Sequence, residues 1–182
     1  LSWPPCILLQ GFVKGEIAKL PVFVDSPLAI NVTDIFRQHT EIFDAETRAF
    51  MARDPNGAAL GFDLLSYTRS VAESKAINFV KEPAIIISAS GMAETGRILH
   101  HLRNNIEDSR NTVILTSWMA PHTLGRRLQE GVKSVRIFGE KHRVEAEVAA
   151  GHDQIDRHRP QGGDREPLVL FVGDGEHPEH GD

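Results

Sequence analysis

The chain has 182 residues, of which 41% are hydrophobic and 25% are charged, and this balance is that of an ordinary soluble globular domain. The single cysteine, Cys6, excludes an internal disulfide and a cysteine zinc cluster and fits a reducing cytoplasm. No apolar run reaches the length of a membrane span, and the first residues lack the pattern of a signal peptide. We therefore expect a cytoplasmic protein without membrane contact and, because the chain begins at Leu1, a fragment.

The charges are unevenly distributed along the chain. Residues 149–182 hold eight Asp or Glu against three Arg, so their net charge equals the −5 of the whole chain. Residues 103–143 hold eight Lys or Arg against four acidic residues. This modest basic surface is compatible with a polyanionic partner, although a charged face that is simply solvated explains it as well.

The first elements along the chain are a helix and a strand. We expect a helix within residues 1–20, after the break at Pro4 and Pro5, and a strand at residues 21–24, PVFV. Asp25, Ser26 and Pro27 then have the pattern of a strand end, a helix cap and a first helical turn. The apolar residues of the following helix recur at helical spacing.

Residues 40–79 contain less regular patterns. Ile42, Ala45 and Ala49 predict a helix over residues 40–51, and residues 54–57, DPNG, predict a turn. Residues 58–68 have the composition of a loop. Ser70 and Glu73 form a predicted capping box, because each side chain can bond the backbone N–H group of the other residue. A helix should therefore run from Ser70 to about residue 79.

The central stretch combines a strand, a tight loop and a helix. Residues 84–87, AIII, predict a strand buried on both faces, and an amphipathic helix should begin at about Ala93. Unpaired N–H groups in such a loop can bind an anion, with Ser88, Ser90 and Arg97 as further donors. A plain strand-to-helix turn is the alternative, and spacing alone favours it.

A third strand-to-helix unit follows. Residues 112–115 predict a strand, residues 123–130 a helix that Gly131 ends, and residues 135–138 and 144–148 two short strands. Repeated units of this kind predict an α/β fold with an open parallel sheet and helices on both faces. Ligands of such sheets bind at the carboxyl ends of the strands, where polar residues gather here: Asp25, Ser26, Ser88, Ser90, Thr116 and Ser117.

Two neighbouring histidines and the serine loop are candidates for metal binding and for nucleophilic catalysis. His100 and His101 are adjacent on the predicted helix, so they point in different directions and form a poor metal chelate. We expect one to pack inside and the other to stay exposed. Residues 88–91, SASG, lack the Gly-x-Ser-x-Gly frame of a nucleophile elbow, and the chain has no phosphate-loop motif.

Four ordered segments resemble one family. The sequences LPVFVDSPLAINVTDIF, RSVAESKAIN, IIISASGMAETGRILHHL and NTVILTSWMAPHTLGRRLQEGVKSVRIFGE resemble the β-CASP region of RNA-processing metallo-β-lactamase-fold hydrolases. That family includes bacterial RNase J and the nuclease subunit of the eukaryotic cleavage and polyadenylation machinery. The resemblance covers about residues 19–148, is greatest to the bacterial and archaeal branch, and favours the anion-binding interpretation of the central loop.

The resemblance implies a zinc-dependent phosphodiesterase that acts on single-stranded RNA. In that family a metallo-β-lactamase lobe holds two zinc ions that activate water, and the β-CASP lobe caps the active site. The implied partners of this chain are single-stranded RNA and the metallo-β-lactamase lobe, and a homodimer stays open. The implied RNA-binding or phosphate-binding residues are Asp25, Ser26, Ser88, Ser90, Gly91, Met92, Arg97 and His100.

The chain also departs from the family pattern. It lacks the upstream His-x-His-x-Asp-His zinc motif and the downstream Ser-Ala-His-Ala-Asp segment, and residues 173–176, GDGE, stand where His-Gly-Glu is expected. No zinc ligand can therefore be assigned. We expect a β-CASP domain over residues 1–148, without the catalytic zinc lobe, that clamps RNA. The alternative is an isolated weak RNA-binding module or a remnant without function.

The end of the chain has its own prediction. Residues 149–182 are rich in Gly, His, Asp and Arg, a composition that favours a disordered tail. A shifted reading frame or a truncated gene product would explain this segment, and a truly divergent end is the alternative.

Overall fold

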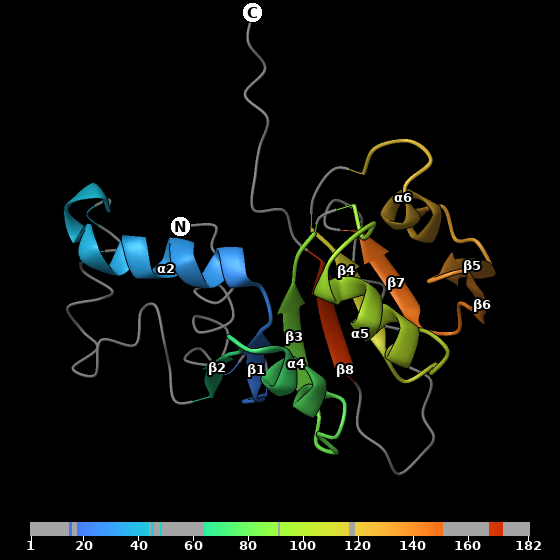
Figure 1. Ribbon diagram of the computed structural model, residues 1–182, viewed down its shortest axis with the longest axis horizontal. Coiled ribbons are helices and arrows are strands. Elements are labelled where there is room, and N and C mark those ends of the chain that lie inside the picture. Colours follow the sequence, from blue (N-terminus) through green and yellow to red (C-terminus); the bar gives the residue numbers. More distant parts are fainter. Residues whose placement is uncertain are drawn as a thin grey trace, which may run out of the picture.

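The computed structural model describes residues 15, 18–43, 45, 48, 64–90, 92–116, 119–150 and 168–172 (Figure 1). Within these ranges the chain forms an open sheet, a separate hairpin and several helices. None of the helices in these ranges combines the length and the hydropathy that crossing a membrane would require.

The sheet has six strands in the order β2-β1-β3-β8-β4-β7, and each neighbouring pair is parallel. A second, two-stranded sheet is an antiparallel hairpin of β5 and β6. This arrangement confirms the predicted α/β fold with a parallel sheet. The strands are β1 (Val22–Val24), β2 (Leu65–Tyr67), β3 (Ala84–Ser88), β4 (Thr112–Leu115), β5 (Ser134–Ile137), β6 (Glu140–Arg143), β7 (Glu147–Ala150) and β8 (Leu168–Val172).

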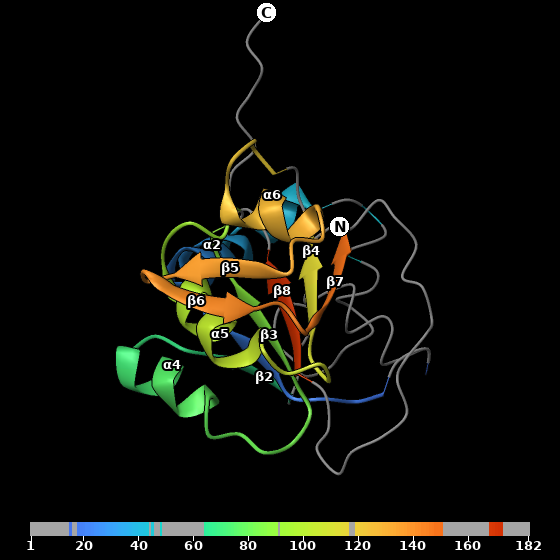
Figure 2. The same cartoon turned by 90° about the vertical axis from the view of Figure 1, so that its right-hand side faces the viewer.

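Helices and the hairpin surround this sheet. Figure 2 shows α4, α5 and the β5–β6 hairpin together on one side of the sheet. Figure 1 shows α2 extending from the end of β1 away from the other helices. The helices are α2 (Pro27–Gln38), α4 (Val71–Ile77), α5 (Arg97–Asn105) and α6 (Leu124–Gln129), and a 3-10 helix, η1, covers Thr40–Ile42.

The two faces of the sheet are both buried. Ile86 of β3 packs with Ile98 and Leu102 of α5, in a cluster that also includes β4, β5 and α6. The neighbouring residues of β3, Ile85 and Ile87, pack on the opposite face with strand β1 and with Ala29 of α2, among others. Successive side chains of a strand point to opposite faces, so a continuous apolar strand such as β3 requires cover on both.

The predicted helix signals are confirmed in the described residues. The hydroxyl oxygen of Ser26 accepts a hydrogen bond of 3.3 Å from the backbone N–H of Ala29, at the start of α2. Ser70 and Glu73 form the predicted capping box at the start of α4. Thr123 caps α6, and Gly131 follows it with a φ of 73°.

The capping box supports a first testable prediction. Ser70→Ala is expected to lower the free energy of unfolding by about 1 kcal/mol, because the N–H of Glu73 loses its acceptor. Ser70→Asp, which keeps a capping acceptor, is the matched control. Denaturant unfolding of the two variants measures the difference, and equal midpoints would show that the cap contributes nothing.

Several predicted boundaries are wrong. Residues 58–68 were expected to be loop, but Leu65–Tyr67 is strand β2 and pairs with β1. Helix α5 begins at Arg97 rather than near Ala93, because Gly96 has a φ of 82°, which a helix cannot contain. The strand predicted at residues 144–148 is β7, which begins at Glu147 instead, and strand β6 was not predicted.

The end of the chain also differs from expectation. Leu168–Val172 lies in the middle of the sheet, paired with both β3 and β4, although it was predicted to belong to a disordered tail. The predicted domain end at residue 148 falls inside β7. Three other predictions lie outside the described residues. They are the remainder of the tail, most of the helix predicted within residues 1–20, and the turn predicted at residues 54–57.

Candidate functional site

Asp25 is the centre of a buried polar cluster at the carboxyl end of β1. Its side chain is completely buried, and the hydroxyl of Thr68 donates to its Oδ1. Arg97 Nη1 lies 2.6 Å from the same oxygen. Ser74 Oγ donates to Oδ2 over 2.6 Å, and His101 Nε2 lies 2.7 Å from Oδ2. The carboxylate therefore has four side-chain partners.

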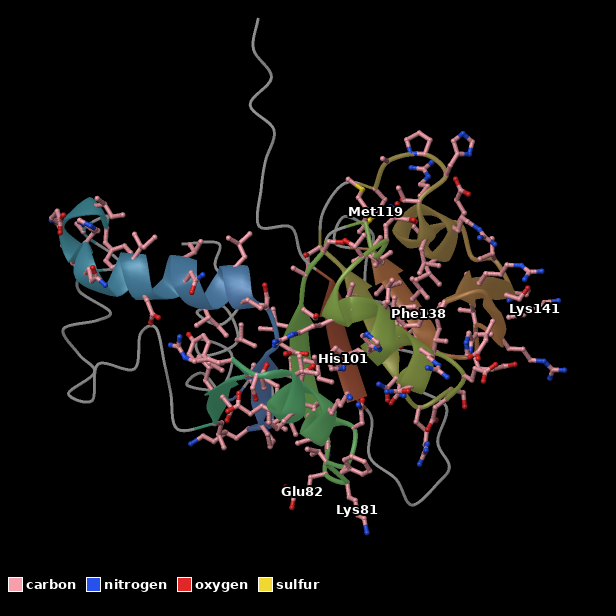
Figure 3. All side chains as sticks on the ribbon, viewed as in Figure 1. Lys81, Glu82, His101, Met119, Phe138 and Lys141 are labelled. Carbon is pink, nitrogen blue, oxygen red and sulfur yellow. The ribbon has the colours of Figure 1, made fainter. Side chains whose placement is uncertain are left out.

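These partners come from segments that are far apart in the sequence. Thr68 follows β2, Ser74 is in α4, and Arg97 and His101 are one turn apart on α5. Figure 3 labels His101 in the middle of the molecule, where α5 lies over the sheet. One carboxylate thus fixes the end of β1 relative to two helices and the end of β2.

Arg97 and a third strand end extend this cluster. Arg97 Nη1 also donates to the carbonyl oxygen of Thr68 over 2.9 Å, and Nη2 donates to that of Arg69 over 3.2 Å. Ser88, at the end of β3, donates its hydroxyl hydrogen to the carbonyl oxygen of Asp25 over 3.1 Å. We define the Asp25 cluster as Asp25, Thr68, Ser74, Ser88, Arg97 and His101.

The pKa of Asp25 is set by two opposing effects. Burial raises the pKa, because it disfavours the charged carboxylate. Hydrogen bonds from His101, Ser74, Thr68 and Arg97 favour the charged form, and together they hold the pKa well below its usual range. Asp25 is therefore ionised at neutral pH, and His101 must carry a proton on Nε2 to donate to it.

The predicted site residues divide into buried and accessible ones. Asp25, Ser26 and Ser88 are 0%, 5% and 1% exposed, so their side chains lie behind the surface. Ser90, Met92 and Arg97 are half-buried, and His100 is exposed. Gly91 lies outside the described residues. The strand-end loop after β3 thus offers the half-buried Ser90 hydroxyl, which donates over 3.4 Å to the carbonyl oxygen of Thr95, and the exposed Thr95.

The prediction for the two histidines is confirmed. His101 is 1% exposed and belongs to the Asp25 cluster. His100 is exposed, and its ring lies 4.7 Å from that of Phe138, at an interplanar angle of 39°. Of these two histidines, only His100 is therefore accessible to a ligand.

The loops after β3 and β4 are packed against each other. The backbone N–H of Gly125 donates to the carbonyl oxygen of Met92 over 3.0 Å. A Cβ atom at Gly125 would lie 2.5 Å from Met119 Sδ and 3.1 Å from that carbonyl oxygen, so any larger residue would displace the Met119 side chain and crowd the backbone of Met92. Figure 3 shows Met119 at one end of the sheet and Lys81 and Glu82 at the other.

Sequence reasoning missed three members of the Asp25 cluster. The sequence pattern predicts only a loop for Thr68 and a helix for Ser74, and it identifies His101 only as one of two adjacent histidines. No local spacing connects them with Asp25, because Thr68 and Ser74 are 43 and 49 residues away in the chain. An aspartate directly after an apolar strand is the one sequence signal for such partners, because an aspartate that becomes buried there needs hydrogen-bond donors.

The described residues do not fit the zinc that the resemblance implies. No group of three or more His, Cys, Asp or Glu side chains in this part of the chain is arranged to hold a metal ion. His101 and Asp25 face each other as donor and acceptor. We therefore derive no catalytic step from these residues.

Comparison with known proteins decides the family. The Beta-Casp domain matches residues 6–128, which is more than half of the chain. The chain belongs to the Beta-Casp family. The Asp25 cluster and the accessible loop after β3 are accordingly features of a Beta-Casp domain, and the resemblance stated from the four segments is confirmed.

Curated relatives support this assignment. Ribonuclease TTHA0252 of Thermus thermophilus is 29% identical over 144 residues, which cover 78% of this chain and 33% of the relative. The RNase J-like protein of Methanocaldococcus jannaschii is 26% identical and covers 78% of the chain and 31% of the relative. Transcription termination factor FttA of Pyrococcus abyssi is 42% identical over 139 residues, which cover 76% of this chain and 21% of the relative. The Beta-Casp chain thus spans between a fifth and a third of the length of these relatives.

Proposed function

We propose that this Beta-Casp domain holds single-stranded RNA for a zinc-dependent phosphodiesterase, whose zinc ions are bound by a metallo-β-lactamase lobe elsewhere in a longer protein. Two relatives are named as ribonucleases or RNase J-like, and a third as a transcription termination factor, which supports RNA as the ligand. In this proposal, the domain contributes binding and orientation.

The Asp25 cluster is the observation that carries the proposal. It connects the ends of β1 and β2 to α4 and α5 through charge-assisted hydrogen bonds to the Asp25 carboxylate, and the end of β3 through a neutral one from Ser88. Charge-assisted bonds are stronger than neutral ones, so the loops at this edge of the sheet are preorganised. The Ser90 hydroxyl and the His100 ring are then held in place for a polyanion.

Arg97 has structural partners besides the phosphate contact that the sequence predicts. The sequence pattern identifies Arg97 as a positively charged donor for the anion-binding loop after β3. In the structure its guanidinium is bonded to Asp25 and two carbonyl oxygens. Because Arg97→Ala would also leave the buried Asp25 without a charged partner, a loss of RNA binding by that variant would not identify a phosphate contact. The phosphate contact of Arg97 stays a prediction.

Ser90 provides the cleaner test. We expect the 182-residue chain to bind a fluorescein-labelled 15-nucleotide oligouridylate, with an association constant that falls as salt is raised. Ser90→Ala should weaken binding about tenfold, because the hydroxyl turns its one hydrogen from the Thr95 carbonyl oxygen to a phosphate, and alanine removes that bond. Fluorescence anisotropy at several salt concentrations measures both effects.

The control is Ser109→Ala, in the exposed turn that precedes β4 at the opposite end of the sheet. It should bind as the wild type does. A folded wild-type chain that does not bind the oligonucleotide would overturn the proposed function. Equal RNA affinities of Ser90→Ala and Ser109→Ala would show that Ser90 does not contact the RNA.

A further inference from the structure

A second candidate site lies on the side of α5 that faces away from the Asp25 cluster. It is a pocket of about 220 Å³ between the loops after β3 and β4, helices α5 and α6, and the β5–β6 hairpin. We propose that it binds one nucleotide of single-stranded RNA, with the base stacked on Phe138 and the adjoining phosphate between Arg127 and Arg136. This inference rests on the proposed function and names a subsite for the same ligand.

The two arginines bring positive charge to the pocket, and neither forms an ion pair with a carboxylate of the described residues, although Glu94 also lines the cavity. Arg127 Nη2 lies 3.5 Å from the carbonyl oxygen of Ser134, and Arg136 Nη1 donates to that of Gly139 over 3.1 Å. Neutral carbonyls hold both guanidinium groups in place. Five other arginines of the described chain are paired with acids, namely Arg69, Arg97, Arg103, Arg110 and Arg126, and Arg143 of β6 is not among them.

Phe138 occupies a position where its residue type is unfavourable for folding. Phe138 and Gly139 form the two-residue turn of the hairpin, with φ values of 52° and 84°. A turn with positive φ at both positions favours Asn-Gly or Asp-Gly, and a bulky residue at the first position is strained. Phe138 is nevertheless 51% exposed, so core packing does not explain it. An exposed aromatic ring on a short turn is a suitable stacking surface for a base.

Backbone strain is concentrated around the same pocket. Ala93, His122 and Phe138 are the non-glycine residues with positive φ in the described chain, and all three line it. They come from three different connections: the loop after β3, the loop after β4 and the hairpin turn. Strained conformations of this kind cluster at binding sites, and here they converge on one cavity.

The remaining lining residues are compatible with a nucleotide. Glu94 accepts a hydrogen bond from the backbone N–H of Leu124, so its charge lies against the first turn of α6. At about 220 Å³ the pocket is smaller than the 300–1,000 Å³ typical of drug-sized ligands, which favours a single base. His100 contacts Phe138, so the pocket adjoins the accessible edge of the proposed RNA path.

The decisive variant is Phe138→Asn. Asparagine suits the positive φ, so the melting temperature should stay the same or rise, while affinity for the labelled oligouridylate should fall about tenfold through the lost stacking. The matched control is Phe79→Asn, because Phe79 is 81% exposed and follows α4. Its RNA affinity should be unchanged. Equal affinities of the two variants would overturn the proposal.

A second pair of variants tests the phosphate contact. Arg136→Gln should reduce the slope of log K against log salt by about one, as expected when one phosphate contact is removed. Arg143→Gln, an exposed arginine on β6, should keep the wild-type slope. An unchanged slope in Arg136→Gln would show that Arg136 does not contact a phosphate and would contradict this part of the proposal.

Two further outcomes separate this inference from the proposed function. If the wild type binds no RNA, the proposed function fails. If it binds RNA and Phe138→Asn binds equally well, only the nucleotide pocket fails. A labelled 15-residue polyglutamate is the competing probe. Binding of that peptide that matches the RNA affinity and is lost in Phe138→Asn would assign the pocket to an acidic peptide and overturn the nucleotide assignment.

Discussion

Asp25→Ala is expected to lower the free energy of unfolding by about 3–5 kcal/mol. The substitution breaks the hydrogen-bonded ion pair of Asp25 with Arg97 and leaves the Arg97 guanidinium without a counter-charge. The Arg97 side chain is only 18% exposed, so water replaces the lost carboxylate poorly. The hydroxyls of Ser74 and Thr68 lose their acceptor inside the protein. Denaturant unfolding followed by circular dichroism measures the loss.

The matched control for this variant is Asp34→Ala. Asp34 pairs with Arg69 over 3.1 Å, and both side chains are at least 36% exposed. An exposed pair contributes about 0–1 kcal/mol, so the control should stay close to the wild type. If the two variants unfolded at the same denaturant concentration, the Asp25 cluster would not stabilise the strand ends as we infer.

The pH dependence of stability provides an independent check of the same carboxylate. The folded pKa of Asp25 lies below its ordinary value of about 4, so the unfolded chain binds the proton first as the pH falls. The stabilisation is therefore complete at neutral pH and is lost progressively below about pH 4. Asp25→Asn should be less stable than the wild type at pH 7, and the difference should narrow as the pH falls below 4.

Leu170→Pro is expected to destabilise the fold by about 3 kcal/mol or more, because proline removes a backbone donor from a central strand. Leu170 is aligned with Ile86 of β3 on one side and with Val113 of β4 on the other. Strand β8 therefore joins the two halves of the sheet, and its loss would separate β2, β1 and β3 from β4 and β7.

Leu170→Val is the matched control, since valine favours strands and keeps the N–H group. It should unfold close to the wild type, and thermal unfolding of the two variants tests the assignment. If proline were tolerated as well as valine, residues 168–172 would not be part of the sheet. The tail would then have the disorder that its composition predicts.

Most helices and strands were predictable from local pattern. The apolar run at residues 84–87, the Asp25-Ser26-Pro27 corner and the Ser70–Glu73 capping box each contain their structural signal within a few residues. Leu65–Tyr67 was missed because a three-residue edge strand offers too short a pattern. Its existence depends on pairing with β1, which is distant in the sequence.

The candidate site was predictable only in part. The rule that ligands bind at the carboxyl ends of parallel strands located Ser88, Ser90 and Asp25 at one edge of the sheet. Burial then separates Asp25 and Ser88, which hold the structure together, from Ser90, which a ligand can reach. Exposure of a polar residue depends on what packs over it, and sequence spacing does not contain that information.

The amino-acid sequence by itself determined the α/β class, the strand-to-helix units and the family, because these depend on apolar periodicity, local capping and ordered motifs. The tertiary structure alone decided which partners surround Asp25, where β8 enters the sheet, and that Arg127, Arg136 and Phe138 meet at one pocket. These features join segments that are far apart along the chain. They form only when the packed core brings those segments together.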